Sequence, residues 1–318
     1  MTHEQRATIA VVGATGAQGG GLVRAILADP ERRFHVRAIT RNPESDDARA
    51  LARSGAEVLK ADLDDLPALE RAFQGADAAF CVTFYWAHLS PEREQVHAQN
   101  LAKAAKRASV SHVIWSTLED TRRFVPLSDP RMPTLMGQYK VPHLDAKGAS
   151  NRIFAELGLP TTYLYTSFFW ENLIAFGLGP KRNAAGLLAF TLPMGSAKLP
   201  GIAADDIGRC ALALFKNGAE AIGASVGIAG DHLSGSEMSA AMAHAFGEPV
   251  IHDDVAPEVY RSFGFPGADD LGNMFQFKRE FEREFRSARS VEASRALYPQ
   301  IQTFSSWLRE NAAKIPRS

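Results

Sequence analysis

The stretch that most constrains the fold of this chain lies near its start, where an apolar run meets a cluster of glycines. Residues 9–12 favour a β-strand, and the apolar residues after Gly21 have helical spacing. Gly13, Gly16 and Gly19 are three apart, so the backbone can turn tightly and approach a pyrophosphate at the start of the helix. A second apolar run at residues 34–40 completes a βαβ unit, so this context predicts a dinucleotide site rather than an ordinary turn.

The glycine turn supplies the first group of predicted cofactor-binding residues. A lone glycine triplet occurs in many turns, so the prediction depends on the strand before it and the helix after it. The residues expected to surround the pyrophosphate are Gly13, Thr15, Gly16, Ala17, Gln18 and Gly19.

The end of the second predicted strand indicates which dinucleotide binds. Residues 35–40 lead into Arg41, Asn42 and Pro43, where the adenosine ribose of a bound dinucleotide would lie. An acidic residue there would bind the 2′-hydroxyl of NAD, whereas a guanidinium suits a 2′-phosphate. Arg41 therefore favours NADP(H). The alternative is a solvated arginine that merely follows a strand.

Helices and strands alternate through the first half of the chain, which predicts an α/β protein with a Rossmann-type doubly wound parallel sheet. We expect an NAD(P)-binding domain over residues 6–166, to which segments around 200–230 return. A smaller α/β domain on the substrate side is expected over 167–318. The predicted helices lie at 46–54, 66–73, 91–109 and 142–157, and the later strands at 57–61, 78–83, 113–116 and 162–166.

Residues that follow the strands are further candidates, because ligands of open α/β sheets bind at the carboxyl ends of the strands. Asp62 and Leu63 are expected near the adenine, and Thr83 and Tyr85 nearer the nicotinamide. A helix N-cap is the alternative for Asp62, and core packing is the alternative for Phe84.

An aromatic run follows the strand predicted at residues 162–166. Ser167 and Phe168 begin this run, which continues to Asn172, and we expect both residues to contact the cofactor. The aromatic side chains are expected either to wall a nicotinamide pocket or to form a hydrophobic core under a loop.

His143 and Lys147 lie four residues apart in the helix predicted to start at Pro142, so both project from one face. A lysine there can hold ribose hydroxyls, and an imidazole can carry a proton. The alternative is an exposed histidine and lysine on a surface helix.

Composition excludes several classes of partner. The formal net charge is −1 and 46% of residues are hydrophobic, so neither nucleic acid nor an anionic membrane is an expected partner. The polar start does not resemble a secretory signal, and no apolar run is long enough to span a bilayer. Cys81 and Cys210 are expected to be buried thiols, which favours a cytoplasmic protein. Residues 252–254 are too compact to indicate a metal site, and none is predicted.

Several motifs together resemble the NmrA-like family of atypical short-chain dehydrogenases/reductases, and especially a member that senses NADPH. They are the glycine turn at 13–19, the strand end at 40–43, and the segments 168–172 and 264–275. The resemblance implies NADP(H) bound across the glycine turn and Arg41, with Lys147 on the nicotinamide ribose. Active relatives of this fold combine a serine, a tyrosine and a lysine. Ser116 and Lys147 match, but His143 stands where the tyrosine would be.

Two functions follow from this resemblance. The first is a redox sensor that binds NADP(H) and signals to a regulated protein partner, with a homodimer as a candidate state. The alternative is a reductase that passes hydride from NADPH to a small quinone, carbonyl or activated alkene, with Lys147, His143 and Ser116 as its catalytic residues. Glu44 and Ser45 stand where NADP-preferring relatives often have basic residues, which leaves Arg41 to select the 2′-phosphate.

Overall fold

The computed structural model describes residues 6–317 and divides into two compact units whose chain segments interleave. Unit 1 comprises the described residues up to Glu119 together with Ala146–Tyr165 and Asp205–Val226. Unit 2 comprises Asp120–Asp145, Thr166–Ala204 and the described residues from Gly227 onward. The predicted division, with residues 6–166 and returning segments around 200–230 in one domain and 167–318 in the other, stays a prediction. Within residues 6–317, no helix has the length and apolar character needed to cross a membrane.

Unit 1 is built on one seven-stranded sheet with the order β11-β6-β5-β4-β1-β2-β3. The neighbouring strands from β3 to β6 pair in parallel. The order reverses at β1, whose neighbours are β2 and β4, so the predicted doubly wound α/β fold is confirmed. The strands are β1 (Ala7–Val12), β2 (Phe34–Thr40), β3 (Glu57–Lys60), β4 (Ala78–Cys81), β5 (His112–Thr117), β6 (Thr161–Tyr165) and β11 (Ser225–Gly227).

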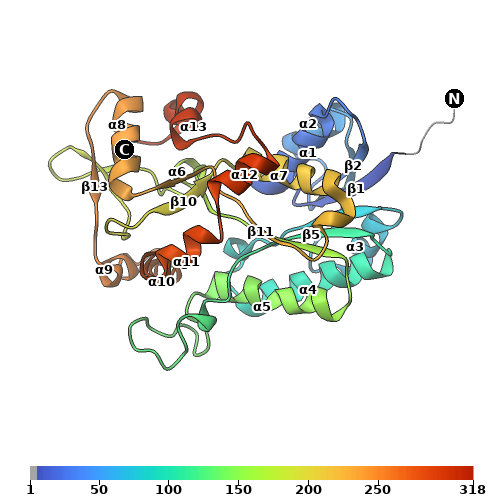
Figure 1. Ribbon diagram of the computed structural model, residues 1–318, viewed down its shortest axis with the longest axis horizontal. Helices are drawn as coiled ribbons and strands as arrows, with labels where there is room; N and C mark the ends of the chain where they lie inside the picture. Colours follow the sequence, from blue (N-terminus) through green and yellow to red (C-terminus); the bar gives the residue numbers. More distant parts are fainter. Residues whose placement is uncertain (1–5, 318) are drawn as a thin grey trace. The chain divides into compact units, whose positions relative to one another are not determined.

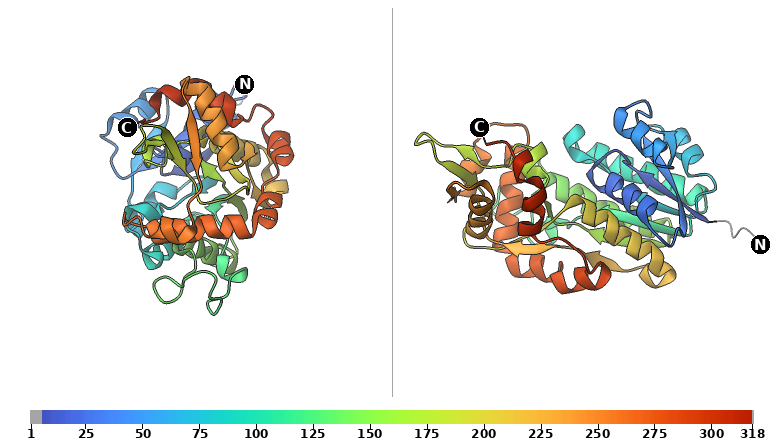
Figure 2. Two further views of the ribbon diagram at one scale, coloured as in Figure 1. Left: turned by 90° about the vertical axis from the view of Figure 1, so that its left-hand side faces the viewer. Right: turned by 90° about the horizontal axis from the view of Figure 1, so that it is seen from above.

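Helices cover both faces of this sheet, with α1, α2 and α7 on one face and α3, α4 and α5 on the other (Figures 1 and 2). Side-chain caps mark several helix starts: Ser45 accepts from Ala48 N, Asp65 from Ala68 N and Ser90 from Arg93 N. The helices are α1 (Ala17–Ala28), α2 (Asp46–Arg53), α3 (Leu66–Phe73), α4 (Pro91–Arg107), α5 (Pro142–Glu156) and α7 (Ala204–Asn217), with 3₁₀ turns η1 (Tyr85–Ala87) and η3 (Gly218–Ala221).

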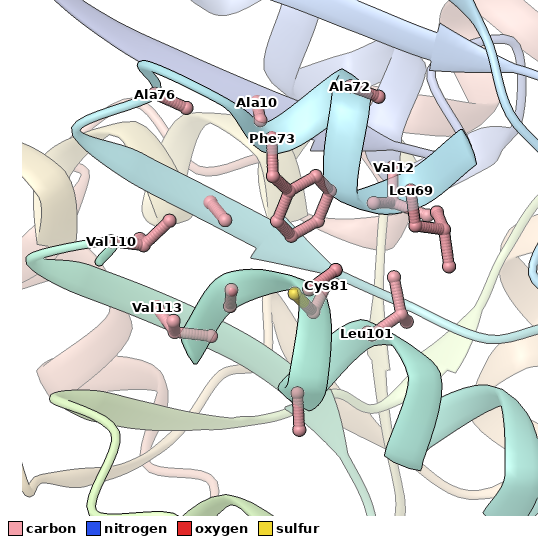
Figure 3. Close-up of a cluster of buried hydrophobic side chains, with 14 of the residues drawn as sticks. Ala10, Val12, Leu69, Ala72, Phe73, Ala76, Cys81, Leu101, Val110 and Val113 are labelled. Atoms are coloured by element: carbon pink, nitrogen blue, oxygen red, sulfur yellow. The ribbon is translucent and has the colours of Figure 1, made fainter. Parts of the chain in front are cut away.

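The core of unit 1 on the second face lies between the sheet and helices α3 and α4 (Figure 3). Leu69 and Phe73 of α3 and Leu101 of α4 pack there on β1, β4 and β5, and each is fully buried. Small residues such as Ala98 and Ala102 repeat at helical spacing on the same face of α4, which lets the helix lie close to the sheet. Burial of this face holds α4 in place, and α4 in turn positions the polar residues described below.

Unit 2 contains two three-stranded sheets and a set of helices. The first sheet has the order β12-β10-β7 and the second has the order β13-β9-β8. Trp170, Phe304 and Trp307 form one aromatic centre of this unit, with ring centroids 5.4–6.1 Å apart. The strands are β7 (Phe168–Phe169), β8 (Lys181–Arg182), β9 (Leu188–Thr191), β10 (Leu199–Ile202), β12 (Asp231–Leu233) and β13 (Val250–Asp253). The helical elements are η2 (Thr121–Arg123), α6 (Asn172–Ala175), α8 (Gly235–Phe246), α9 (Pro257–Arg261), α10 (Ala268–Glu280), α11 (Glu282–Ser287), α12 (Val291–Leu297), α13 (Phe304–Asn311) and η4 (Ala312–Lys314).

The observed elements differ from the predicted ones at a few places. Strand β4 ends at Cys81 rather than Thr83, because its ladder with β5 stops at the pair Cys81–Trp115. Phe84 is 51% exposed, so the expected alternative of core packing for this residue is wrong. Helix α10 was not predicted, although its first residues belong to the 264–275 motif; Gly267, with φ 84°, forms its N-cap.

Candidate functional site

The glycine turn between β1 and α1 has the backbone geometry that a tightly bound phosphate group needs. Gly13 has φ 64°, a left-handed conformation that favours glycine, and Gly16 N donates to Gly13 O at 2.8 Å. A Cβ on Gly19 would lie 2.4 Å from Gly13 O and 2.6 Å from Val12 O, so only glycine fits there. Gly13, Thr15, Gly16 and Ala17 are exposed, and Gly16 caps α1 without a side-chain bond. The start of α1 is therefore open to an anion.

The strand-β2 end holds an arginine that is free to bind an anion. Arg41 is exposed and forms no hydrogen bond or ion pair with any residue in the range 6–317. The next residues are used locally: Ser45 caps α2, and Glu44 Oε2 lies 3.4 Å from Arg49 Nη1.

The residues after β3 form a compact turn. The Asp62 carboxylate accepts from Asp64 N at 3.0 Å, and Leu63 O accepts from Asn100 Nδ2 at 2.8 Å. Asp65, not Asp62, is the N-cap of α3, so the alternative that we considered for Asp62 is wrong. Asp62 is exposed and Leu63 is half-buried.

Lys147 of α5 lies in a buried polar cluster in unit 1. Its Nζ donates to Thr83 O at 3.1 Å and to Thr83 Oγ1 at 2.5 Å, and lies 2.7 Å from Glu94 Oε1. Thr83 Oγ1 donates in turn to Glu94 Oε1 at 2.5 Å. Glu94 has no exposed surface, and only 11% of the Lys147 side chain is exposed. The alternative of an exposed lysine is therefore wrong, and Thr83 and Glu94 hold its ammonium group.

The pKa of Glu94 reflects two opposing effects. Burial alone would raise the pKa of this carboxyl group, because a buried charge loses its hydration. The charge of Lys147 and the hydrogen bonds from Lys147 and Thr83 outweigh burial and hold the pKa below its ordinary value. Glu94 is therefore a carboxylate at neutral pH, and Lys147 is its counter-ion.

His143 faces a different carboxylate, in unit 2. Its Nδ1 lies 2.6 Å from Asp270 Oδ1, and its backbone N donates to Asp270 Oδ2 at 3.1 Å. His143 is also buried, so it is not the exposed histidine of the alternative interpretation. Although His143 and Lys147 are one turn apart on α5, their side chains thus belong to separate polar clusters. The unpredicted helix α10 supplies the partner of His143.

Ser116 and Gln18, two further predicted residues, are hydrogen-bonded to each other at the glycine turn. Ser116, at the carboxyl end of β5, donates from Oγ to Gln18 Oε1 at 2.7 Å, and Ser116 is buried. Thr15 Oγ1 lies 3.5 Å from Thr40 Oγ1, which joins the turn to the end of β2. Tyr85 is buried in η1, where its ring meets Trp86 and His88 edge to face.

The predicted residues Ser167 and Phe168 belong to unit 2. Ser167 Oγ donates to Ile228 O, and Phe168 is buried in β7. Trp170 of the same aromatic run packs on Phe304 and Trp307. At Trp170, the expected core packing is thus the arrangement observed, while cofactor contact by Ser167 and Phe168 stays a prediction.

The sequence analysis did not identify the buried polar residues of α4, one of which, Glu94, contacts Lys147. Glu94 and His97 occupy the same face of α4 as Ala98 and Leu101, all four at helical spacing and all buried. Charged and imidazole groups on the apolar face of an amphipathic helix are the signal that identifies such residues. His88, just before α4, completes this group: its Nε2 lies 3.4 Å from Glu94 Oε2.

Known proteins resemble this chain along most of its length. The NAD(P)H azoreductase of Xenophilus azovorans is 30% identical over 275 residues, which cover 84% of this chain and 86% of that protein. The match to the NmrA-like family domain-containing oxidoreductase notA′ of Aspergillus versicolor is shorter. It is 39% identical over 129 residues and spans 39% of this chain and 36% of that relative.

Solved structures of NmrA, a negative transcriptional regulator, have the same fold. The complexes of NmrA with NAD and with NADP superimpose with TM-scores of 0.79 and 0.77. Both are 25% identical to this chain and cover 96% of it and 95% of the NmrA chain. The model of the NmrA-like family matches residues 5–308. With its doubly wound sheet and open glycine turn, this chain belongs to the NmrA-like family.

Proposed function

We propose that this protein binds NADP(H) at the glycine turn of unit 1. The observation that carries the proposal is Gly19, where backbone oxygens leave no room for a Cβ while the turn at Gly13 to Ala17 is open. The start of α1 would hold the pyrophosphate, and the unpaired guanidinium of Arg41 would bind the 2′-phosphate. The NAD and NADP complexes of the related NmrA support a nicotinamide dinucleotide of either kind, and Arg41 is the reason to prefer NADP(H).

We further propose that the bound cofactor serves a reduction. The cofactor supplies hydride when it is bound, and the protein supplies binding, orientation and a proton. Lys147 is a suitable proton donor, because Glu94 and Thr83 hold its ammonium group in one place at the carboxyl end of β4. The resemblance to an NAD(P)H azoreductase over most of both chains favours a small unsaturated acceptor, such as an azo dye, a quinone or an enone.

The decisive experiment is NADPH oxidation by the purified protein, followed by nicotinamide absorbance against a panel of azo compounds, quinones, aldehydes, ketones and enones. Lys147→Ala is the test variant and Lys106→Ala, on an exposed part of α4, is the matched control. We expect turnover in the wild-type protein and in the control, and a loss of about a hundredfold in Lys147→Ala, the usual contribution of an acid–base group. An unchanged rate in Lys147→Ala would exclude this role for the lysine.

A redox sensor is the second candidate, and the position of His143 favours it. Where active relatives of the fold have a tyrosine, His143 is instead bound to Asp270 inside unit 2. A sensor must distinguish the two forms of the cofactor by affinity or by shape. Binding of NADPH and NADP⁺ measured by calorimetry, with self-association followed by sedimentation, tests this candidate. Equal affinities and equal assembly states with both forms would eliminate it.

A further inference from the structure

Three buried polar atoms in unit 1 converge beside Lys147. Glu94 uses Oε1 for Lys147 and Thr83, while its Oε2 faces His88. One ligand atom from each of Glu94, His88 and His97 lies within 4.8 Å of the other two. Glu94 Oε2, His88 Nε2 and His97 Nδ1 are all buried. None of these atoms has a hydrogen-bond partner among the described residues. Because unpaired polar atoms are costly to bury, such a cluster in a well-packed core calls for a function.

The cluster connects Lys147 with the surface. On its outer side, His97 Nε2 lies 2.9 Å from Asp64 Oδ1. The Asp64 side chain is 44% exposed and also pairs with Arg93. Ionisable groups therefore follow one another from solvent to the buried ammonium group, in the order Asp64, His97, Glu94 and Lys147.

Two histidines and a carboxylate also form a common ligand set for a metal ion, but two features oppose that use. Ser90 N donates to His88 Nδ1 at 3.1 Å, so the proton of the neutral ring lies on Nε2, the atom that would have to bind the metal. In addition, the Lys147 ammonium lies 2.7 Å from the Glu94 carboxylate and already neutralises it. The arrangement suits the transfer of protons better than the binding of a cation.

We propose that His97 and Glu94 form a proton-delivery path from the surface at Asp64 to Lys147, and that His88 positions Glu94. The proposal rests on the proposed reductase, in which Lys147 gives a proton to the reduced acceptor. Nζ is then a neutral amine. A water molecule between the two groups carries a proton from the His97 imidazolium Nδ1 to Glu94 Oε2, rotation of the carboxyl group turns this O–H toward Lys147, and the proton passes to Nζ. Lysine and glutamate regain their charges, His97 recovers its proton from water, and the net change is one proton taken from solvent.

The charges around the path fit this use. The pKa of His88 is lowered, chiefly by burial, although the nearby Glu94 carboxylate acts to raise it. His88 is therefore neutral at pH 7 and presents its Nε2 proton to Glu94. Lys147 and Thr83 face Glu94 from the inner side, and Arg93 and Asp64 face His97 from the outer side. A carboxylate between a lysine and a histidine can accept a proton from one and release it to the other.

The first test compares His97→Gln with His112→Gln under steady-state and single-turnover conditions. His112 is a matched control, because it is also a buried histidine of unit 1 and its ring lies 2.9 Å from Thr162 Oγ1, away from the path. We expect steady turnover of His97→Gln to fall about tenfold, within the range of acid–base contributions. The first turnover and NADPH affinity should stay as in the wild type, because Lys147 starts protonated. Added imidazole should restore the rate of His97→Ala.

A steady-state rate for His97→Gln equal to that of the wild type would overturn the path, as would the absence of imidazole rescue. A second measurement does not depend on turnover: the histidine ring signals are titrated by NMR in the wild type and in Glu94→Gln. Loss of the carboxylate should lower the pKa of His88 further, and an unchanged His88 titration would refute the coupling. Failure of the wild-type protein to oxidise NADPH with any acceptor would instead refute the reductase, and the delivery role with it.

Discussion

The buried pair of Lys147 and Glu94 should show a large energetic coupling. Lys147→Met leaves a carboxylate with no exposed surface and no counter-ion at 2.7 Å, which costs about 3–5 kcal/mol in known buried pairs. Glu94→Gln leaves an ammonium group that still has Thr83 O and Oγ1 as partners, so we expect about 1–3 kcal/mol. The double variant buries no charge, so its cost should be only about 1–3 kcal/mol. The coupling energy, which is the summed cost of the two single variants less that of the double variant, is then about 3–5 kcal/mol.

The assay has to report on unit 1 separately, because a chain of two units need not unfold in one step. Amide hydrogen exchange in strands β4 and β5, followed by mass spectrometry with rising urea, gives the local free energy of unfolding. The buried Trp115, whose ring lies 5.4 Å from Lys147 Nζ, offers a fluorescence signal from the same region. The two single variants each lose some free energy of unfolding. If these two losses add up to the loss of the double variant within about 0.5 kcal/mol, Lys147 and Glu94 are not energetically coupled and the prediction is refuted.

The same pair makes a pH prediction with a definite sign. Because the pKa of Glu94 in the folded protein lies below its ordinary value of 4.5, its contribution to stability is present above that value. The contribution is lost as the pH falls through the folded-state pKa. Glu94→Gln should therefore lose less stability between pH 6 and acid pH than the wild type does, as measured by urea midpoints. Parallel pH curves for the two proteins would contradict this.

Three further predictions concern the cofactor turn and the thiols. Gly19→Ala places a methyl group 2.4 Å from Gly13 O, so it should cost about 1–3 kcal/mol and abolish NADPH binding. Gly75→Ala has nothing within 4 Å but a φ of 70°, so it should also cost about 1–2 kcal/mol yet bind NADPH normally in a fluorescence titration. Arg41→Glu should weaken NADPH binding about tenfold or more and change NADH binding less. An equal loss of affinity for NADPH and NADH would show that Arg41 does not bind the 2′-phosphate. Burial raises the pKa of Cys81 and raises that of Cys210 to about 12, so a disulfide reagent at pH 8 should label both only after unfolding.

Local patterns in the sequence were sufficient for the sheet and for the glycine turn, while cofactor binding at that turn stays a prediction. The period of the apolar residues separated strands from helices, and the glycines at positions 13, 16 and 19 marked the turn. These features are readable because each depends on neighbours within a few residues: a φ of 64° at Gly13, or the lack of room at Gly19, is a property of one short segment. The order of alternating elements then led to the doubly wound topology, since few arrangements satisfy right-handed crossovers.

The partners of the buried polar side chains were decided only by the tertiary structure. His143 and Lys147 are one turn apart, which suggested joint action, yet His143 bonds Asp270 and Lys147 bonds Thr83 and Glu94. Those partners lie from 53 to 127 residues away in the chain. Their meeting depends on how α4 and Lys147 of α5 pack within unit 1, and on how α10 packs beside His143 within unit 2. Sequence periodicity predicts which face of α4 is buried. Only the tertiary structure determines that Lys147 of α5 is the charged group that contacts Glu94 on this face.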